Sequence, residues 1–488
     1  MGQLGRVPED KQANDLLQQG IRCSEEGDVD RALQSLDDAL ALAPGHPVIH
    51  YNRGLVLQKV GLLDESLADY RSATNSDPTL SRAWVNQAFA LIALGRYPQA
   101  IEAADRAIQQ QNLEPSAWLA KGNALKGIHA LGQAAEAFHQ GVQLAPDAKE
   151  LKASLANTLR ELGQPEESIV LLRETIAQFP DFAEAQRDLA HALLLNGEYL
   201  EGWKQNRWRW KTQSLAEGQR HKSIPEWTGQ TLTGKRILLW DEQGFGDSIQ
   251  FVRFVPWVSE LGAEVVLEVQ SGLVRLFQTV RGVITVVARG EKLPEVDYQV
   301  SLLDLGDVFK TDPFAIPNEV PYLDVLAQET KGERLRFGIC WAGNPMHDND
   351  RNRSLDPELL QSVFSSEGIE CHSLQVGARE VEAERVSDLT PLSFSPSDFF
   401  DTAKLIASMD VVISVDSAIA HLAGALGKEV WILLPFAPDW RWMLSVEDSP
   451  WYPSATLIRQ NRAGNWGGAI TKILQKLAVR LPEIELDD

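Results

Sequence analysis

A period of 34 residues runs through the first part of the chain and constrains its fold more than any other feature. Prolines recur on that period, and glycines recur on it in a second register. Asn112 takes the place of one proline, and His129 takes the place of one glycine. The two series are Pro44, Pro78, Pro146 and Pro180, and Gly27, Gly61, Gly95, Gly163 and Gly197. A fixed period of this length indicates stacked helical repeats.

A third series places a small residue in the first helix of each unit, at Gly20, Gly54 and Gly122 and at Ala88, Ala156 and Ala190. A small side chain there lets the partner helix approach closely, and the later glycine ends the first helix. The pattern resembles the tetratricopeptide repeat, a helix–turn–helix unit. We expect an N-terminal tail over 1–12 and six repeats over 13–214. Such α-superhelices usually hold an extended protein or peptide in a concave groove. A passive scaffold, or an arm that pairs two copies in a homo-dimer, is the alternative.

The charge and the cysteines narrow the class of protein. The net charge of −22 and the pI near 4.9 argue against nucleic acid as a main partner, although a bound nucleotide remains compatible with them. The cysteines Cys23, Cys340 and Cys371 are scattered, which favours a reducing compartment. The N-terminus is polar and no run of 18 apolar residues exists, so we expect a cytoplasmic protein without a membrane span.

The second half alternates short β-rich runs with helical runs after a polar linker over 215–234. This alternation predicts parallel sheets covered by helices. A proline-containing stretch, 312–324, divides the set into two Rossmann-like halves, 235–325 and 326–488, that face each other across a cleft. The predicted strands are RILLW (236–240), EVVLEV (264–269), VITVVAR (283–289), RFGICWAG (336–343), ECHSLQVG (370–377), VVISVD (411–416) and VWILLP (430–435).

One candidate site follows the strand that ends at Asp416. We expect Asp416 to cap a helix over 417–426, so that the N–H groups of Ser417 and Ala418 form an anion site suited to a diphosphate. His421 lies near the same end, where the helix dipole disfavours imidazolium. In the alternative interpretation, Asp416 is only a cap and His421 is a core histidine bonded to a carbonyl.

A second candidate loop, NPMHDNDRNRS (344–354), follows Gly343 and includes Asn344 and His347. Its arginines Arg351 and Arg353 suit bidentate binding of a diphosphate. Surface ion pairs with Asp348 and Asp350 are the alternative. DND at 348–350 also matches a short metal-binding pattern, but we expect no metal, because arginine and the helix dipole can supply the charge.

These residues carry a resemblance. The turn at 416–421 is similar to that of the heptosyltransferase family, glycosyltransferase family 9, in which it holds the donor diphosphate. Repeats joined to such a domain resemble O-GlcNAc transferase. The whole chain looks most like bacterial repeat-containing glycosyltransferase-like proteins. The resemblance implies a GT-B pair of domains that transfers a sugar from a nucleotide diphosphate without a metal. Ala418 stands where glycine is usual. The segments that carry the resemblance are DEQGFGDSIQFVRFVPWV (241–258), GICWAGNPMHDNDRNRS (338–354), SVDSAIAHLAGALGKEVWILLP (414–435) and PDWRWMLSVEDSPWYP (438–453).

The segment DEQGFGDSIQFVRF follows the first predicted strand. Gly244 and Gly246 permit a tight turn, and we expect Asp247 to cap a helix that begins at Ser248. The resemblance implies that Asp247 is the base that takes the proton of the acceptor hydroxyl. A cap without catalytic function is the alternative. Asp241, Glu242 and His347 are reserve candidates for the base.

A tryptophan-rich loop covers 437–453. Its Arg441 could reach a phosphate. The aromatic residues could stack on a sugar or base, but packing of the loop against the C-terminal helix is the favoured interpretation; they are Trp440, Trp442, Trp451 and Tyr452. RWRWK (207–211) is expected to cap the repeats and pack at the domain junction, and Trp341 is expected in the core.

Together these features predict an α plus α/β chain, a tetratricopeptide superhelix followed by a GT-B pair. The predicted function is a metal-independent glycosyltransferase that moves a sugar from a nucleotide-sugar to a protein or glycan held by the repeats, with no separate cofactor. The first alternative is a non-catalytic repeat scaffold with a degenerate transferase domain. A sugar-nucleotide 2-epimerase-like enzyme is a further alternative, which leaves the repeats unexplained.

Overall fold

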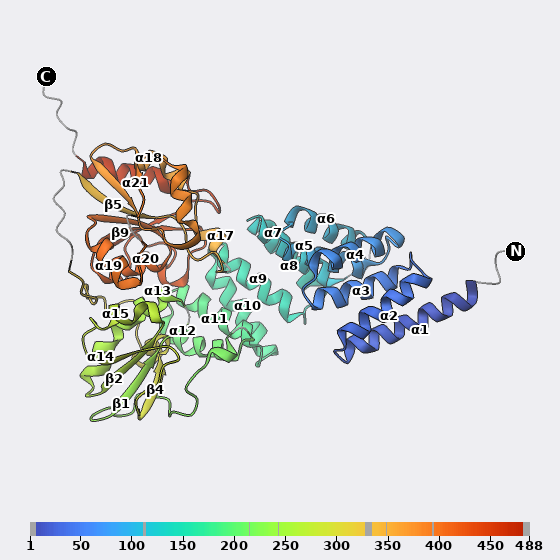
Figure 1. Cartoon of the computed structure of the whole chain (residues 1–488), viewed down its shortest axis with the longest axis horizontal. Helices are drawn as coiled ribbons and strands as arrows, with labels where there is room; N and C mark the ends of the chain where they lie inside the picture. Colours follow the sequence, from blue (N-terminus) through green and yellow to red (C-terminus); the bar gives the residue numbers. More distant parts are fainter. Residues whose placement is uncertain are drawn as a thin grey trace, which may run out of the picture. The chain divides into compact units, whose positions relative to one another are not determined.

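The computed structural model describes residues 6–110, 114–213, 215–242, 244–326, 334–347, 349–392 and 395–481, with side chains from Lys11 onward. The chain divides into two compact units, Met1–Leu162 and Gly163–Asp488 (Figure 1). The first unit is helical, and the second unit contains further helices and two parallel sheets. The predicted fold class, helical repeats followed by two parallel-sheet domains consistent with a GT-B-like pair, is confirmed.

The helices of the first unit follow the predicted period. The first helix begins at Arg6, seven residues ahead of the predicted first repeat, and its Pro8 falls in the first turn, where proline is tolerated. Helices of the same kind open the second unit. The helices are α1 (Arg6–Glu25), α2 (Val29–Leu42), α3 (Pro47–Lys59), α4 (Leu63–Ser76), α5 (Ser81–Ala93), α6 (Tyr97–Gln109), α7 (Pro115–Gly127), α8 (Leu131–Leu144) and α9 (Lys149–Glu161), then α10 (Pro165–Gln178), α11 (Ala183–Leu195) and α12 (Tyr199–Asn206).

The glycines of the repeat end its first helix, as predicted. Gly27, Gly61 and Gly95 have φ of 83°, 82° and 70°, the left-handed conformation that glycine adopts at little cost. His129, which replaces glycine in this series, adopts the same conformation with φ of 61°. The small residue of the first helix permits close packing, because a Cβ built on Gly54 would lie 2.7 Å from Cε1 of Tyr70.

The first sheet of the second unit is parallel and has the strand order β3-β2-β1-β4. The strands at 236–240 and 264–269 lie where the sequence predicts them, and a short fourth strand was not predicted. The elements are β1 (Arg236–Trp240), β2 (Glu264–Val269), β3 (Val283–Ala288), β4 (Tyr298–Ser301), α13 (Phe245–Phe251), α14 (Val255–Glu260), α15 (Val274–Phe277) and α16 (Leu305–Val308).

The second sheet is also parallel and has the order β10-β9-β8-β5-β6-β7. Counted from β5, this is the doubly wound order in which ligands bind beside the point where the strand order reverses. That switch point lies between β5 and β8. The elements are β5 (Leu335–Cys340), β6 (Ile369–Ser373), β7 (Leu389–Thr390), β8 (Val411–Val415), β9 (Glu429–Leu434), β10 (Ala455–Arg459), α17 (Asp350–Arg353), α18 (Gln361–Phe364), α19 (Phe399–Ala407), α20 (Ala418–Ala425) and α21 (Gly467–Arg480). Trp341 is fully buried beside β5, as predicted.

The segment predicted as a polar linker, 215–234, is packed on the first sheet. Trp227 is buried, and its backbone N–H donates to the carbonyl oxygen of Gln299 in β4 at 2.9 Å. Ile224 and Trp210 pack against Leu238 and Trp240, whose buried side chains form the apolar face of the sheet on this side. A parallel sheet requires cover on both faces, and this segment supplies cover for one of them. The exact domain bounds stay a prediction.

Candidate functional site

The switch point of the second sheet is built by the chain that follows β8. Val415 ends the strand, and Ser417 is the N-cap of α20, with its Oγ accepting from the N–H of Ile419 at 3.3 Å. The prediction that Asp416 caps this helix is therefore wrong. Both residue types are good caps, but the extended backbone of Ser417, with φ of −152° and ψ of 171°, places serine at the cap position. The N–H of Ile419 is bonded within the turn.

Asp416 is buried beside this turn, and its environment determines its protonation. Burial and, after it, the neighbouring Asp439 carboxylate raise the pKa of Asp416, which is about 6 in the folded protein. The guanidinium groups of Arg353 and Arg441 act in the opposite direction. A carboxyl held this way alternates between acid and carboxylate near neutral pH, and both arginines are within electrostatic reach of it.

Arg353 comes from α17, in the loop after β5. A Cβ built on Gly343 would lie 2.7 Å from Nη2 of Arg353, so only glycine at position 343 leaves room for the guanidinium in this position. Nε of Arg353 is buried without a hydrogen-bond partner among the described residues, and the nearest carboxylate oxygen, on Asp350, is 3.9 Å away. Asp350 instead accepts from Arg379 and Ser354, at 2.8 and 2.7 Å.

The other predicted residues of this loop lie outside that cluster. Arg351 is exposed, and so are Asn344 and His347, which form turns within the loop: Asn344 Oδ1 accepts from Met346 N at 3.0 Å, and His347 Nδ1 accepts from Asn349 N at 3.1 Å. Asp348 falls outside the described residues.

His421 is buried in the first turns of α20 and is neutral near pH 7. Burial lowers its pKa well below the usual value, and the nearby Arg441 and Arg253 lower it further. Its Nδ1 lies 2.9 Å from the hydroxyl of Tyr452, and its ring stacks on Trp442. The predicted lowering of the pKa is found, with desolvation as its main cause. His421 is buried, as the alternative interpretation has it, but the partner of its Nδ1 is a tyrosine hydroxyl and not a carbonyl.

Helix α13 of the first half packs on α20 at this histidine. A Cβ built on Gly246 would lie 2.9 Å from Cδ2 of His421 and 3.6 Å from Cα of Ala418. Gly246 is therefore required for a close approach of the two helices. Gly244 is the N-cap of α13 and has an extended backbone, with φ of −80° and ψ of 165°.

Asp247 lies within the first turn of α13, which begins at Phe245, and not at its cap as predicted. The extended residue that caps the helix is Gly244, three residues before Asp247. The backbone N–H of Gly244 donates to Oδ2 of Asp247 at 2.9 Å, so the aspartate side chain reaches back to the cap residue. The other carboxylate oxygen accepts from Nη2 of Arg441, in the second half. Asp247 is thus neutralised by an arginine in this arrangement.

Arg441 connects the elements of the site. Its side chain donates to Asp247, to Oδ1 of Asp439 at 2.8 Å and to Oε1 of Gln250 at 2.6 Å. The guanidinium is 4.4 Å from the ring centroid of Trp440. Nε2 of Gln250 is buried without a partner among the described residues. Gln250, Asp439 and Arg253 were missed from the sequence, although Gln250 and Arg253 stand in the quoted motif around Asp247.

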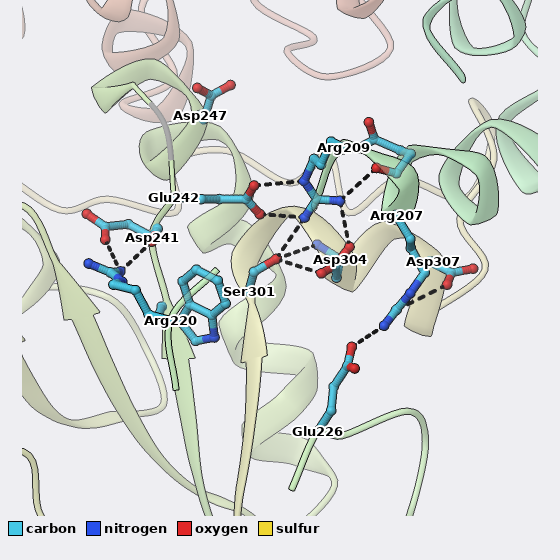
Figure 2. A network of polar contacts seen from close by, with 12 residues as sticks. Arg207, Arg209, Arg220, Glu226, Asp241, Glu242, Asp247, Ser301, Asp304 and Asp307 are labelled. Atoms are coloured by element: carbon cyan, nitrogen blue, oxygen red, sulfur yellow. Dashed lines mark hydrogen bonds and ion pairs between the residues drawn. The ribbon is translucent and has the colours of Figure 1, made fainter. Parts of the chain in front are cut away.

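Two of the reserve candidates for the base are held in ion pairs. Asp241 pairs with Arg220 and Arg289, at 2.7 and 2.8 Å, and accepts from the N–H of Gln270. The carboxylate of Glu242 accepts hydrogen bonds from both Nε and Nη2 of Arg209, at 2.8 and 2.7 Å (Figure 2). Burial raises the pKa of Glu242 in spite of this arginine.

The aromatic residues of the 437–453 loop are buried, but they do not pack as predicted. Trp440 and Trp451 pack with Trp203 of α12, with ring centroids 5.2 and 6.5 Å apart, and Tyr199 of the same helix joins them. Trp442 and Tyr452 surround His421. The aromatic residues therefore pack on α12 and α20, while the loop meets the C-terminal helix through the ion pair of Glu447 with Lys472.

The tetratricopeptide repeat family matches residues 13–81, 85–149 and 153–202. The N-terminal part of the chain thus consists of tetratricopeptide repeats, and two parallel-sheet α/β domains follow them. Protein FlbA of Caulobacter vibrioides is 27% identical to it over 495 residues, which cover 92% of this chain and 82% of that protein.

Solved structures resemble parts of the chain. A repeat protein of Thermus thermophilus, TTC0263, covers 37% of this chain and 99% of its own at 21% identity and a TM-score of 0.33. PilF of Pseudomonas aeruginosa covers 43% and 95%, at 20% identity and a TM-score of 0.37. Within the described residues, no helix is both long and apolar enough to cross a bilayer.

Proposed function

We propose that the second unit is a GT-B-type glycosyltransferase that uses a nucleotide-diphosphate sugar. The observation that supports it best is the placement of two largely buried arginines, Arg353 and Arg441, beside the first turn of α20 at the switch point of a doubly wound sheet. Arg353 carries a buried N–H without a described partner. Buried unpaired donors beside a helix N-terminus suit an oxyanion.

In the proposed reaction, the two guanidinium groups hold the diphosphate as it leaves the anomeric carbon. The bond between that carbon and the acceptor oxygen forms as the bond to the diphosphate oxygen breaks. The acceptor hydroxyl proton passes to a carboxylate, for which Asp247 is the candidate. We propose that no metal is required, because two guanidinium groups can neutralise the leaving group.

The N–H of Gly244 and the guanidinium of Arg441 each occupy one oxygen of Asp247, so we propose that Arg441 leaves this carboxylate before it takes the acceptor proton. A bound diphosphate offers Arg441 a competing anion. Donor binding would thus free the base in the state in which it is needed.

The pairing of Asp247 also favours a second candidate, a non-catalytic repeat scaffold, because Asp241 and Glu242 are held in ion pairs as well. In that case the pair of Asp247 and Arg441 is only a structural link between the halves.

A thermal-shift screen distinguishes the two. UDP, GDP, ADP, CMP and dTDP are each added with and without EDTA, and a ligand that binds only the folded state raises the melting temperature. We expect one diphosphate to give an EDTA-insensitive shift that Arg353→Gln abolishes. Arg385→Gln is the matched control, because the Arg385 side chain is 44% exposed and its pairs with Asp356, Glu358 and Glu382 lie away from α20 in the sequence. No shift with any nucleotide favours the scaffold.

We further propose that the repeats recruit a protein or peptide acceptor, as such superhelices commonly do. Gly122→Leu tests this, because Gly122 lies against the ring of Phe138 in the first unit. The variant should raise KM for a protein acceptor and leave the diphosphate shift unchanged. An unaltered KM counts against recruitment by the repeats.

A further inference from the structure

The first sheet has a switch point of its own, and a side chain of the repeats fills it. The order β3-β2-β1-β4 places this point between β1 and β4. Asp241 and Glu242 follow the carboxyl end of β1, and Ser301 and Asp304 stand at the end of β4. In an open α/β sheet a ligand binds at this position. Figure 2 shows the guanidinium of Arg209 there instead.

The guanidinium of Arg209 is fully engaged. Beyond the two bonds to Glu242, Nη1 donates to Oδ1 of Asp304 at 2.9 Å and to the carbonyl oxygen of Asn206 at 3.0 Å, and Nη2 donates to Oγ of Ser301 at 3.2 Å. The five N–H groups of an arginine are thus all used. The residue is 1% exposed.

Arg209 lies in a short 3-10 helix, Arg207–Lys211, that continues α12 directly. Together, α12 and this 3-10 helix contact the two loops that carry Asp247 and Arg441. Arg209 binds Glu242, in the loop that leads into the helix of Asp247. Trp203 of α12 packs on Trp440, which adjoins Arg441. One helical element thus supports the two loops that carry the Asp247–Arg441 pair.

We propose that Arg209 is a positioning residue, which occupies the switch point of the first sheet and fixes the 241–247 loop so that Asp247 faces the diphosphate site. The inference rests on the proposed function for its catalytic consequence, but its structural part is independent of it. The same inference places ligand binding at the switch point of the second sheet, because the Arg209 side chain fills the switch point of the first sheet.

Arg209→Lys is the test variant. It keeps the charge, but a single ammonium cannot make the bidentate contact with Glu242 and also reach Asp304 and Ser301. Hydrogen exchange is measured on the full chain. Exchange of amides in 241–251 should accelerate by about tenfold or more, because their local anchor is lost. Strands β2 and β8 should keep their protection.

Arg207→Lys is the matched control. Arg207 lies in the same element and pairs with Glu226 and Asp307, neither of which belongs to the 241–247 loop (Figure 2). It should leave exchange in 241–251 unchanged. An equal effect in both variants, acceleration spread over the whole first sheet, or no acceleration overturns the inference. If Arg209→Lys does not fold, Glu242→Gln weakens the same contact from the other side and must give the same local pattern.

Kinetics provide a second readout. In Arg209→Lys, kcat for sugar transfer should fall by about tenfold or more, while the thermal shift by the diphosphate stays as in the wild type, because the diphosphate site belongs to the other half. A loss of the diphosphate shift instead of kcat contradicts positioning of Asp247. If the wild type binds no diphosphate, the proposed function fails, and the exchange pattern still decides whether Arg209 fixes the loop.

Discussion

Arg441 in the second α/β half donates a hydrogen bond to the carboxylate of Asp247 in the first half, across a sequence separation of 194 residues. The side chains of Arg441 and Asp247 are both largely shielded from water, and the same guanidinium also donates hydrogen bonds to Asp439 and Gln250. It is therefore a link between the halves as well as the centre of the candidate site.

Replacing this arginine should destabilise the second unit strongly. Arg441→Gln leaves the carboxylates of Asp247 and Asp439, which are 18% and 36% exposed, without their cation, and losing charge-assisted hydrogen bonds of this kind costs about 1.5–3 kcal/mol. Arg275→Gln is the control, because Arg275 also joins the halves, through Asp398 and Asp401, but its side chain is 47% exposed. That loss should stay below about 1 kcal/mol. Urea unfolding followed by tryptophan fluorescence measures both; equal losses would contradict the buried character of the Arg441 pair.

Asp416→Asn should stabilise the protein above pH 6. The pKa of Asp416 in the folded state is about 6, against an ordinary 3.8, so the folded state binds the proton more tightly. Its contribution to stability is present below pH 3.8 and is lost as the pH rises through 6. The neutral amide avoids that loss, a gain of about 1–3 kcal/mol at pH 7.5. Free energies of unfolding at pH 4 and 7.5 check this. A gain of equal size at pH 4 would show that packing, not charge, causes it.

His421→Gln should reduce the loss of stability on acidification. Because the pKa of His421 is lowered well below 6.5 in the folded state, the unfolded chain binds the proton first as the pH falls. The contribution of neutral His421 is complete above pH 6.5 and declines below it, with a slope of up to about 1.4 kcal/mol per pH unit. Unfolding at pH 5, 6, 7 and 8 gives the slope. The exposed His139→Gln should leave it unchanged.

Gly246→Ala should force α13 away from α20, because the added Cβ meets the ring of His421 at 2.9 Å. Overpacking of this kind costs about 1–3 kcal/mol. In Gly132→Ala, the added Cβ has no atom within 4 Å, and the helix should gain about 0.5–1 kcal/mol. Thermal unfolding distinguishes them. If Gly246→Ala is neutral, the two helices are not closely packed in solution.

The strands that sequence predicts best are those with long apolar runs. RILLW and EVVLEV coincide with β1 and β2, since β-branched and aliphatic residues buried on both faces leave little ambiguity. The strand ATLIR, β10, was missed because it is short and lies behind the aromatic loop, where tryptophans suggest a site rather than a sheet.

At the candidate site, the residue types could be predicted, but their partners could not. Asp416 and Ser417 are equally good caps on paper, and only the backbone turn chooses between them. The contacts of Arg441 with Asp247 and of Arg209 with Glu242 depend on how distant segments fold together, which no local pattern encodes.

The aromatic packing of Trp203 on Trp440 has a consequence for building chimeras. A foreign repeat array fused after residue 214 would bring its own terminal helix, without Trp203 to fill the space beside Trp440 or Arg209 to reach Glu242. The transplantable module therefore includes α12 and its 3-10 extension. A junction within the loop between α9 and α10, near Leu162, keeps that module whole and coincides with the boundary between the two compact units.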